Sequence, residues 1–273
     1  MTIIAPNWDL LHSGPADAEH TVLLIPGSLA TAVFYAEVMA EPSLRDVRLV
    51  AATLPGQGGT QPAGEPSIEN YARLTGELAA DLGAQVLVGH STGGSVVLEA
   101  AASGAFSGPL VLLAASLSRR DEPLAPRILD RLSTVFGHLP YAVALRFIGS
   151  MLGGGVPADR LDALVAELRK NDPRLVRRHN RLYLKYLDRH GSTAWRLCES
   201  GVRAWVVYGE QDEVGITDTE RTILDDCPST TVQTIAGTGH LIPNTRPDVV
   251  ANLITQALHE HPRQPRTQRF TGG

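Results

Sequence analysis

Six short apolar runs, rich in β-branched residues, recur along the chain and are bounded by turns. They cover residues 21–25, 47–51, 86–88, 110–114, 204–208 and 231–235. A strand that exposes one face to water alternates apolar and polar residues, whereas these runs are too continuously apolar for that. We therefore expect strands that are buried on both faces, as in a parallel sheet covered by helices.

Helical periodicity lies between several of these runs. Apolar residues recur at every third or fourth position over 68–82, continue over 96–102 and form one stripe over 247–258. Alternating strands and helices predict an α/β fold, with a doubly wound, mostly parallel sheet flanked by helices.

Residues 117–197 interrupt this alternation, because they show only helical patterns. A helical insertion between two buried strands is expected to cover the carboxyl ends of the strands, where open α/β sheets bind ligands. The sequence thus predicts a core domain (residues 1–116 and 198–261), a helical cap or lid (117–197) inserted after the sixth strand, and a disordered polar tail (262–273). The glycines at 153–155 are a candidate hinge for the cap, or a plain loop.

Composition and charge narrow the class of protein. The 273 residues are 43% hydrophobic and 19% charged, a normal globular balance. The net charge of −5 argues against nucleic acid as a partner, since phosphate binding needs a basic excess. The two cysteines lack metal-ligand spacing, the N-terminal residues do not resemble a secretory signal, and no apolar run reaches the ~20 residues of a membrane span. We expect a cytoplasmic protein, either monomer or homodimer.

One serine lies between glycines directly after an apolar run, in Gly89-His90-Ser91-Thr92-Gly93. A serine on a sharp strand-to-helix turn has a strained backbone and an exposed hydroxyl, as a nucleophile requires. The alternative is an ordinary glycine-rich turn. The motif alone does not decide between the two.

Two later turns supply the groups that a serine nucleophile needs. A hydroxyl is a poor nucleophile at neutral pH, so it needs a base, and the base needs an orienting carboxylate. Asp212 follows the strand expected at 204–208, and His240 follows the one at 231–235. Both turns are expected at the same sheet edge as Ser91. The chain order is serine, acid, histidine.

In these motifs the chain resembles serine hydrolases of the α/β-hydrolase fold, over about residues 20–260. Three further stretches strengthen the likeness: Pro26-Gly27-Ser28-Leu29, the glycine-rich turn at 54–59, and the helix that begins at Pro247 after the histidine turn. The resemblance implies that Ser91 is the nucleophile, that His240 is the general base and that Asp212 orients the imidazole.

The same resemblance implies an oxyanion hole made of two backbone N–H groups. Thr92, the residue after the nucleophile, supplies one group, and Ser28 supplies the other, with Leu29 as the second choice. Pro26 stands where the family usually has histidine, which a main-chain donor tolerates. Loss of one such donor typically lowers the rate by ~10²–10³.

Several residues compete for these roles. Glu210, Glu213 and Asp121 are alternatives to Asp212 as the orienting acid. His90 is expected to be structural, because neighbours on a sharp turn point apart. Three histidines of the predicted cap are expected at the surface, although one of them could line the site: His138, His179 and His190.

The predicted cap also contains apolar and basic clusters. Its apolar residues could wall a substrate pocket, but packing on the core is the expectation we favour: Val135, Phe136, Leu139, Tyr141, Phe147, Ile148, Met151 and Leu152. Its basic residues are expected to form a solvated helix face, or else a patch for an anionic substrate portion: Arg174, Arg177, Arg178, Arg181, Lys185 and Arg189.

Together these features predict a serine hydrolase that cleaves a carboxylic ester, or a related acyl bond, of a small to medium apolar substrate through an acyl-enzyme. A cofactor-free perhydrolase or haloperoxidase, a thioesterase and a carbon–carbon bond hydrolase use the same three residues. A non-catalytic ligand-binding receptor on the same fold is the alternative of another class. We expect no cofactor and no metal, since no nucleotide-binding loop or metal-ligand cluster is evident.

Overall fold

Seven strands form one sheet in the order β1-β3-β2-β4-β5-β6-β7 in the computed structural model, which describes residues 8–149 and 158–260. Its strands are β1 Asp9–Ser13, β2 Thr21–Ile25, β3 Arg48–Thr53, β4 Val86–His90, β5 Leu110–Leu113, β6 Ala204–Gly209 and β7 Thr230–Ile235. Only β1 runs antiparallel to its neighbour. The predicted α/β fold with a mostly parallel sheet is confirmed.

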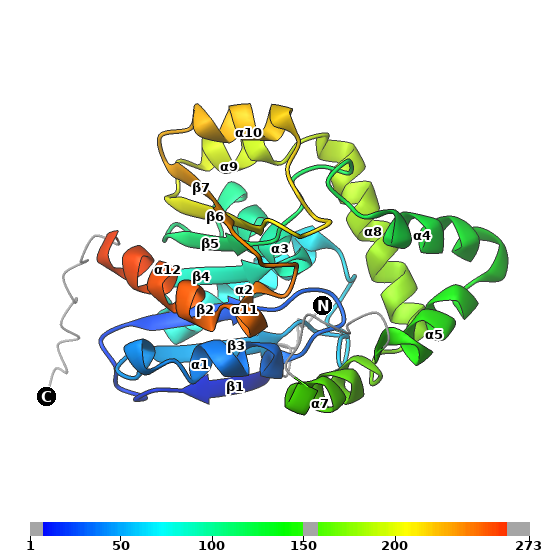
Figure 1. Cartoon of the computed structure of the whole chain (residues 1–273), viewed down its shortest axis with the longest axis horizontal. Coiled ribbons are helices and arrows are strands. Elements are labelled where there is room, and N and C mark those ends of the chain that lie inside the picture. Colours follow the sequence, from blue (N-terminus) through cyan, green and yellow to red (C-terminus); the bar gives the residue numbers. More distant parts are fainter. Residues whose placement is uncertain (1–7, 150–157, 261–273) are drawn as a thin grey trace, which may run out of the picture.

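Helices cover both faces of this sheet (Figure 1). They are α1 Ala36–Met39, α2 Ile68–Leu82, α3 Thr92–Ala102, α4 Leu124–Phe136, α5 Leu139–Arg146, α7 Ala158–Leu168, α8 Pro173–His190, α9 Ala194–Ser200, α10 Asp218–Asp225, α11 Ile242–Thr245 and α12 Pro247–Glu260. Two 3-10 turns, η1 Ala32–Tyr35 and η2 Pro42–Leu44, accompany α1.

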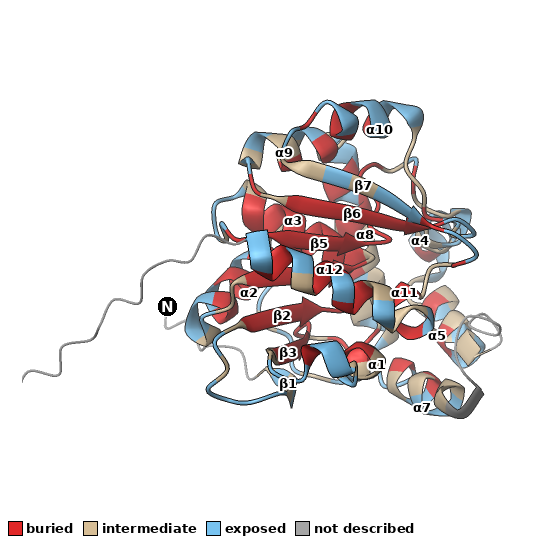
Figure 2. Cartoon of the chain, turned by 60° about the vertical axis from the view of Figure 1, so that its left-hand side comes forward, coloured by how far each residue is buried: buried red, intermediate tan, exposed pale blue. Residues whose placement is uncertain are grey.

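The two faces of the sheet are buried in separate apolar clusters. Alternate strand residues such as Leu23 and Leu87 pack with α2, α3, α8 and α9, while their neighbours Leu24 and Val88 pack with α1 and α12. Successive side chains of a strand point to opposite faces, so a strand covered on both sides is apolar at most of its positions. This explains the continuous apolar runs of β2, β4, β5 and β6, which are entirely buried (Figure 2).

The two outermost strands differ from the sequence-based expectation. We expected the run at 231–235 to be buried on both faces, but β7 lies at an edge of the sheet and most of its residues are exposed or half-buried (Figure 2). β1, at the other edge, was not predicted, because its half-exposed sequence lacks a continuous apolar run.

Local signals set the ends of the predicted helices. Ser67 accepts a hydrogen bond from the N–H of Asn70 and caps the N-terminus of α2, and Gly83 ends the helix with a φ of 65°. α12 begins at Pro247, as the sequence predicts.

Helices α4, α5, α7, α8 and α9 lie between β5 and β6 in the chain. The arrowheads of β2, β5, β6 and β7 point toward the side of the molecule on which α4, α5 and α7 lie (Figure 2). Within the described residues this helical segment follows the fifth strand, β5, and not the sixth. Its division from the core as a cap stays a prediction. The expected hinge at 153–155 and the tail at 262–273 lie outside the described residues.

Glu99 ties three of the covering helices together. This buried residue of α3 accepts a hydrogen bond from Tyr186 Oη of α8 at 2.9 Å and pairs with Arg196 Nη2 of α9 at 2.7 Å. A buried carboxylate that loses its cationic partner is strongly destabilised.

Replacing Arg196 with Met is therefore expected to lower the free energy of unfolding by about 2–3 kcal/mol, measured by urea denaturation. Arg73→Met is the matched control, because Arg73 forms an exposed pair with Glu77 and such pairs contribute about 0.5 kcal/mol or less. Equal losses in the two variants would contradict the role given to Glu99.

Candidate active site

Ser91 lies at the sharp turn between β4 and α3. Its φ of 52° and ψ of −123° are a conformation that residues with a side chain rarely adopt. A Cβ on Gly89 would come within 2.4 Å of Gly93 O, and one on Gly93 within 2.3 Å of Ile25 O. Both positions therefore require glycine, as the motif indicated.

His240 and Asp212 are hydrogen-bonded to each other. The Nδ1 atom of His240 lies 2.9 Å from Asp212 Oδ2 and 3.1 Å from Oδ1. The Asp212 side chain is 1% exposed, and that of His240 is 34% exposed. An ionised carboxylate can only accept, so Nδ1 carries the hydrogen and a neutral ring has its lone pair on Nε2.

The backbone holds the acid turn and the histidine turn together. Gln211 N–H donates to Thr238 O at 2.9 Å, and Glu210 N–H donates to Ile235 O at 2.9 Å. A Cβ on Gly209 would come within 2.2 Å of Thr238 O, so the close approach of the two turns requires glycine there.

His90 connects the serine turn to the histidine turn. Its Nε2 lies 2.9 Å from the carbonyl oxygen of His240, which can only accept, so Nε2 donates. Its ring packs between those of Phe34 and His240, at centroid distances of 4.7 and 4.8 Å. Burial lowers the pKa of His90 to about 3, so the ring is neutral. The structural role expected for His90 includes support of His240, which its sequence position did not indicate.

The loop that follows β2 packs against the serine turn. A Cβ added to Gly27 would lie 3.0 Å from Ser91 Cβ, which places the loop after β2 directly against the serine. Among the described residues, no hydrogen bond joins Ser91 Oγ to His240. Such bonds are often long before substrate binds and tighten in the reacting complex.

The candidate oxyanion-hole residues Ser28 and Leu29 differ in the hydrogen bonding of their backbone N–H groups. Among the described residues, the N–H groups of Ser28 and Thr92 donate to no acceptor, whereas the N–H of Leu29 donates to Gln57 Oε1. The Ser28 and Thr92 side chains are hydrogen-bonded to each other at 2.8 Å. The geometry thus favours the N–H of Ser28 over that of Leu29 as a hydrogen-bond donor to an oxyanion.

The competing acids are engaged elsewhere or exposed. Glu210 Oε2 accepts a hydrogen bond from Gly237 N–H, and Glu213 is exposed. Asp121 Oδ2 accepts from the N–H groups of Leu117 and Ser118 at 2.9 and 2.6 Å. Of these acids, only Asp212 is hydrogen-bonded to His240.

The chain matches a known protein family over most of its length. A family model described as the alpha/beta hydrolase family matches residues 22–253. The chain belongs to the alpha/beta hydrolase family. It is 24% identical over 257 residues to the uncharacterized hydrolase YugF of Bacillus subtilis, covering 87% of this chain and 89% of that protein.

Solved structures show the same fold. A thermophilic esterase from Thermogutta terrifontis superposes with a TM-score of 0.71 at 19% identity, over 94% of this chain and 98% of that one. The N-acyl homoserine lactonase AidH, complexed with N-butanoyl homoserine, gives a TM-score of 0.72 at 18% identity, over 97% of each chain.

The helical segment of this hydrolase departs from two expectations. Val135, Phe136, Leu139 and Phe147 are more than half exposed, so they do not pack on the core as we favoured. Tyr141 is buried and accepts a hydrogen bond from Asn180 Nδ2 at 2.7 Å. Ile148 is half-buried, and Met151 and Leu152 lie outside the described residues.

The basic face of α8 is not free to bind an anion over its whole length. Arg178, Arg181 and Arg189 pair with Glu65, Asp130 and Glu69 of other elements. His138 and His190 of this segment are half-buried, but His179, for which we expected a surface position, is buried.

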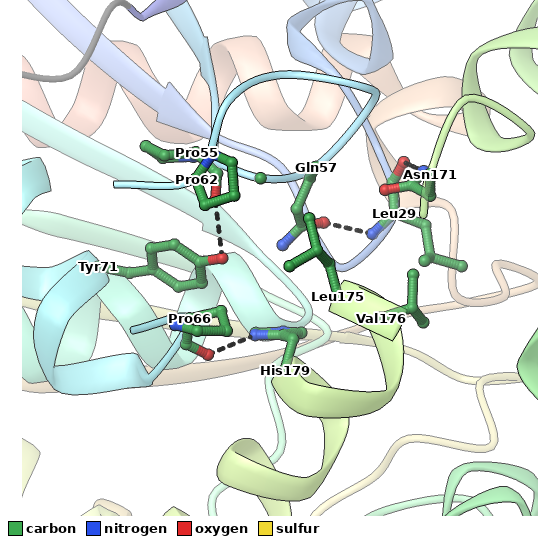
Figure 3. Close-up of a pocket in the computed structure, with 11 residues that line it drawn as sticks. Leu29, Pro55, Gln57, Pro62, Pro66, Tyr71, Asn171, Leu175, Val176 and His179 are labelled. Carbon is green, nitrogen blue, oxygen red and sulfur yellow. Dashed lines mark hydrogen bonds between the residues drawn. The ribbon is translucent and has the colours of Figure 1, made fainter. Parts of the chain in front are cut away.

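His179 lines a small pocket between α8 and the loops that follow β2 and β3 (Figure 3). Tyr71, Gln57 and Leu29 line it as well. Within the described ranges, no group of three or more histidine, cysteine, aspartate or glutamate residues could hold a metal ion. Also within them, no helix has the length and apolar character to cross a membrane.

The buried carboxyl group of Asp121, which does not contact His240, is expected to make the folding stability of this hydrolase depend on pH. Burial, and to a lesser extent the charge of Glu220, raise the pKa of Asp121 from 3.8 to about 6. Asp121 Oδ1 and Glu220 Oε2 have no hydrogen-bond partner among the described residues. A raised carboxyl pKa means that the folded state binds the proton more tightly, so stability falls as pH rises through this range.

Asp121→Asn is expected to remove this penalty. An amide can accept from Leu117 and Ser118 through its oxygen and present N–H groups toward Glu220. We expect the variant to gain stability over the wild type between pH 4 and pH 6, and to exceed it by about 1–3 kcal/mol at pH 8, because one pKa unit corresponds to about 1.4 kcal/mol. Denaturation across pH measures this, with Asp46→Asn as an exposed control. A gap that does not change with pH would contradict the account.

Proposed function

We propose that this hydrolase cleaves a carboxylic ester, or a related acyl bond, of a small to medium apolar substrate through an acyl-enzyme on Ser91. The observation that carries the proposal is the hydrogen bond between the buried Asp212 carboxylate and the partly exposed His240, whose turns follow strands at the same sheet edge as Ser91 in its strained turn. The N–H groups of Ser28 and Thr92, which donate to no acceptor among the described residues, complete the set. These are the parts that acyl transfer needs: a nucleophile, a base, an orienting acid and an oxyanion hole.

In the first half-reaction, Ser91 Oγ attacks the carbonyl carbon and its proton passes to His240 Nε2. The carbonyl oxygen becomes an oxyanion, which accepts hydrogen bonds from the N–H groups of Ser28 and Thr92. As the tetrahedral intermediate collapses, the bond to the leaving group breaks, and the imidazolium gives its proton to that group.

In the second half-reaction, water attacks the acyl-enzyme. His240 takes a proton from the water, and the same two N–H groups stabilise the second oxyanion. Collapse releases the carboxylic acid and returns the proton to Ser91. Asp212 holds the imidazole in the required tautomer and stabilises the imidazolium in both halves.

Ser91→Ala is expected to lower kcat/KM for p-nitrophenyl butyrate by at least ~10³-fold, because it removes the attacking atom. A fluorophosphonate probe is expected to label the wild type on Ser91 and to leave this variant unlabelled. If the wild type hydrolyses esters no faster than Ser91→Ala and is not labelled, the proposal is wrong and a ligand-binding protein is favoured.

Replacing each candidate acid separates their roles. Asp212→Asn is expected to lower kcat by ~10⁴-fold, the size seen when a buried acid that orients a catalytic histidine is replaced by its amide. Asp121→Asn is the matched control and is expected to keep kcat within about twofold, because Asp121 contacts the turn at Leu117 and not His240. The opposite order would assign the role of orienting acid to Asp121.

A further inference from the structure

A chain of hydrogen bonds links the serine turn to helix α8. Thr92 Oγ1 lies 2.8 Å from Ser28 Oγ, which lies 3.0 Å from His179 Nε2. His179 Nδ1 lies 3.0 Å from the carbonyl oxygen of Pro66. The chain therefore joins four parts of the molecule: the turn that bears Ser91, the loop after β2 that bears Ser28, the helical segment between β5 and β6, and the loop between β3 and α2 that bears Pro66.

The direction of every bond in this chain is determined. The carbonyl oxygen of Pro66 can only accept, so His179 carries its hydrogen on Nδ1. Burial lowers the pKa of His179, which keeps the ring neutral and leaves a lone pair on Nε2. Ser28 Oγ–H must therefore donate to Nε2, and Ser28 Oγ accepts from Thr92 Oγ1–H. The Ser28 hydroxyl thus donates one hydrogen bond and accepts one.

The ring of His179 is fixed by packing as well as by hydrogen bonds. It lies almost parallel to the ring of Tyr183, at a centroid distance of 6.4 Å, and 5.6 Å from the ring of Tyr71. Figure 3 shows the ring reaching from α8 toward Pro66. Packing and hydrogen bonds hold the ring in one position. The Ser28 hydroxyl, which donates to this ring, is therefore held in place as well.

A second side chain from the same segment holds the next residue of the loop. Asn171, just before α8, donates from Nδ2 to Leu29 O at 2.8 Å and accepts from Gly58 N–H at 2.9 Å. Leu29 has a φ of 72°, a left-handed conformation that costs energy for a leucine. Its N–H is held by Gln57 and its carbonyl oxygen by Asn171, so both sides of this strained residue are fixed.

We propose that His179 is a positioning residue, through which α8 sets the orientation of the Ser28 main-chain N–H relative to Ser91. This inference rests on the proposed function, in which that N–H stabilises the oxyanion. Because the Ser28 side chain is held by Thr92 and His179, rotation of the residue is restricted and its main-chain N–H is kept in one orientation. Full activity therefore requires α8 to be docked against the loop, while His179 itself contacts no reacting atom.

The sequence provides a set of variants to test this. His179→Phe removes both hydrogen bonds and keeps an aromatic ring. His179→Gln keeps an oxygen that can accept from Ser28 Oγ–H. Ser28→Ala removes the hydroxyl but keeps the backbone N–H. His190→Phe is the matched control, because His190 is half-buried on the same helix and contacts Tyr186 instead of the loop.

With p-nitrophenyl butyrate, His179→Phe is expected to lower kcat about ten- to a hundredfold, because small displacements of a catalytic group have effects of this size. KM is expected to stay within about twofold, since the hole acts on the transition state. His179→Gln should recover most of the loss, and His190→Phe should match the wild type. The double variant Ser28→Ala/His179→Phe should have the same kcat as Ser28→Ala alone, because both substitutions remove the same hydrogen bond between Ser28 and His179.

Hydrogen exchange of the peptide that spans Ser28, followed by mass spectrometry, gives a readout that does not need turnover. Exchange is expected to be faster in His179→Phe than in the wild type and in His190→Phe. Unchanged exchange, or a double variant whose kcat loss is the product of the single losses, overturns the inference. If the wild type shows no turnover that depends on Ser91, the proposed function is wrong. Hydrogen exchange alone then decides whether His179 holds the Ser28 loop in place.

Discussion

The backbone at Ser91 has a conformation that residues with side chains avoid, and the surrounding backbone is packed too closely to relax it. Gly89 and Gly93 leave no room for a Cβ, because the start of α3 and the end of β2 press against the turn. The strain is held by a sheet that is buried on both faces and therefore cannot shift locally. Everything else proposed for the site depends on this fixed point.

The remaining groups of the site reach Ser91 through the topology of the sheet. Ser28, Ser91, Asp212 and His240 each follow a parallel strand, and the carboxyl ends of parallel strands meet at one edge. Each of these four positions lies within a few residues of a strand end. Although they are far apart in the chain, they are therefore brought to the same edge of the sheet. The two pairs of turns are then fastened by specific contacts: His90 to the His240 carbonyl, and Gln211 to Thr238.

Much of this arrangement could be predicted from the sequence, because it rests on local patterns. Continuous apolar runs identified the buried strands, and glycines beside Ser91 and before His240 marked the turns. The pattern is weaker where burial is one-sided: β1 was missed, and β7 was expected to be buried when it forms an edge. The sequence favoured Asp212 over Asp121 as the orienting acid but left Asp121 open, since both follow apolar strands, and the tertiary structure places Asp212 on His240.

The contacts made by histidines could not be predicted, because they depend on how distant segments dock. His179 lies 151 residues from Ser28, and His90 lies 150 residues from His240. No spacing or periodicity reports such pairs. A histidine on a helix is more often exposed than buried, and the ring of His179 is buried only because Tyr71, Tyr183 and the Pro66 carbonyl surround it. The helical segment therefore contacts the Ser28 loop through His179, which its apolar stripe did not suggest.

Transfer of the acyl group to Ser91 is tested by trapping the group on that residue. The wild type is mixed with a p-nitrophenyl ester, quenched in acid within the first turnovers, digested and mapped by mass spectrometry. We expect a burst of p-nitrophenol and the mass of the acyl group on the peptide that contains Ser91. Hydrolysis with no acyl adduct on that peptide, or an adduct on a carboxylate instead of Ser91, would refute acyl transfer to Ser91.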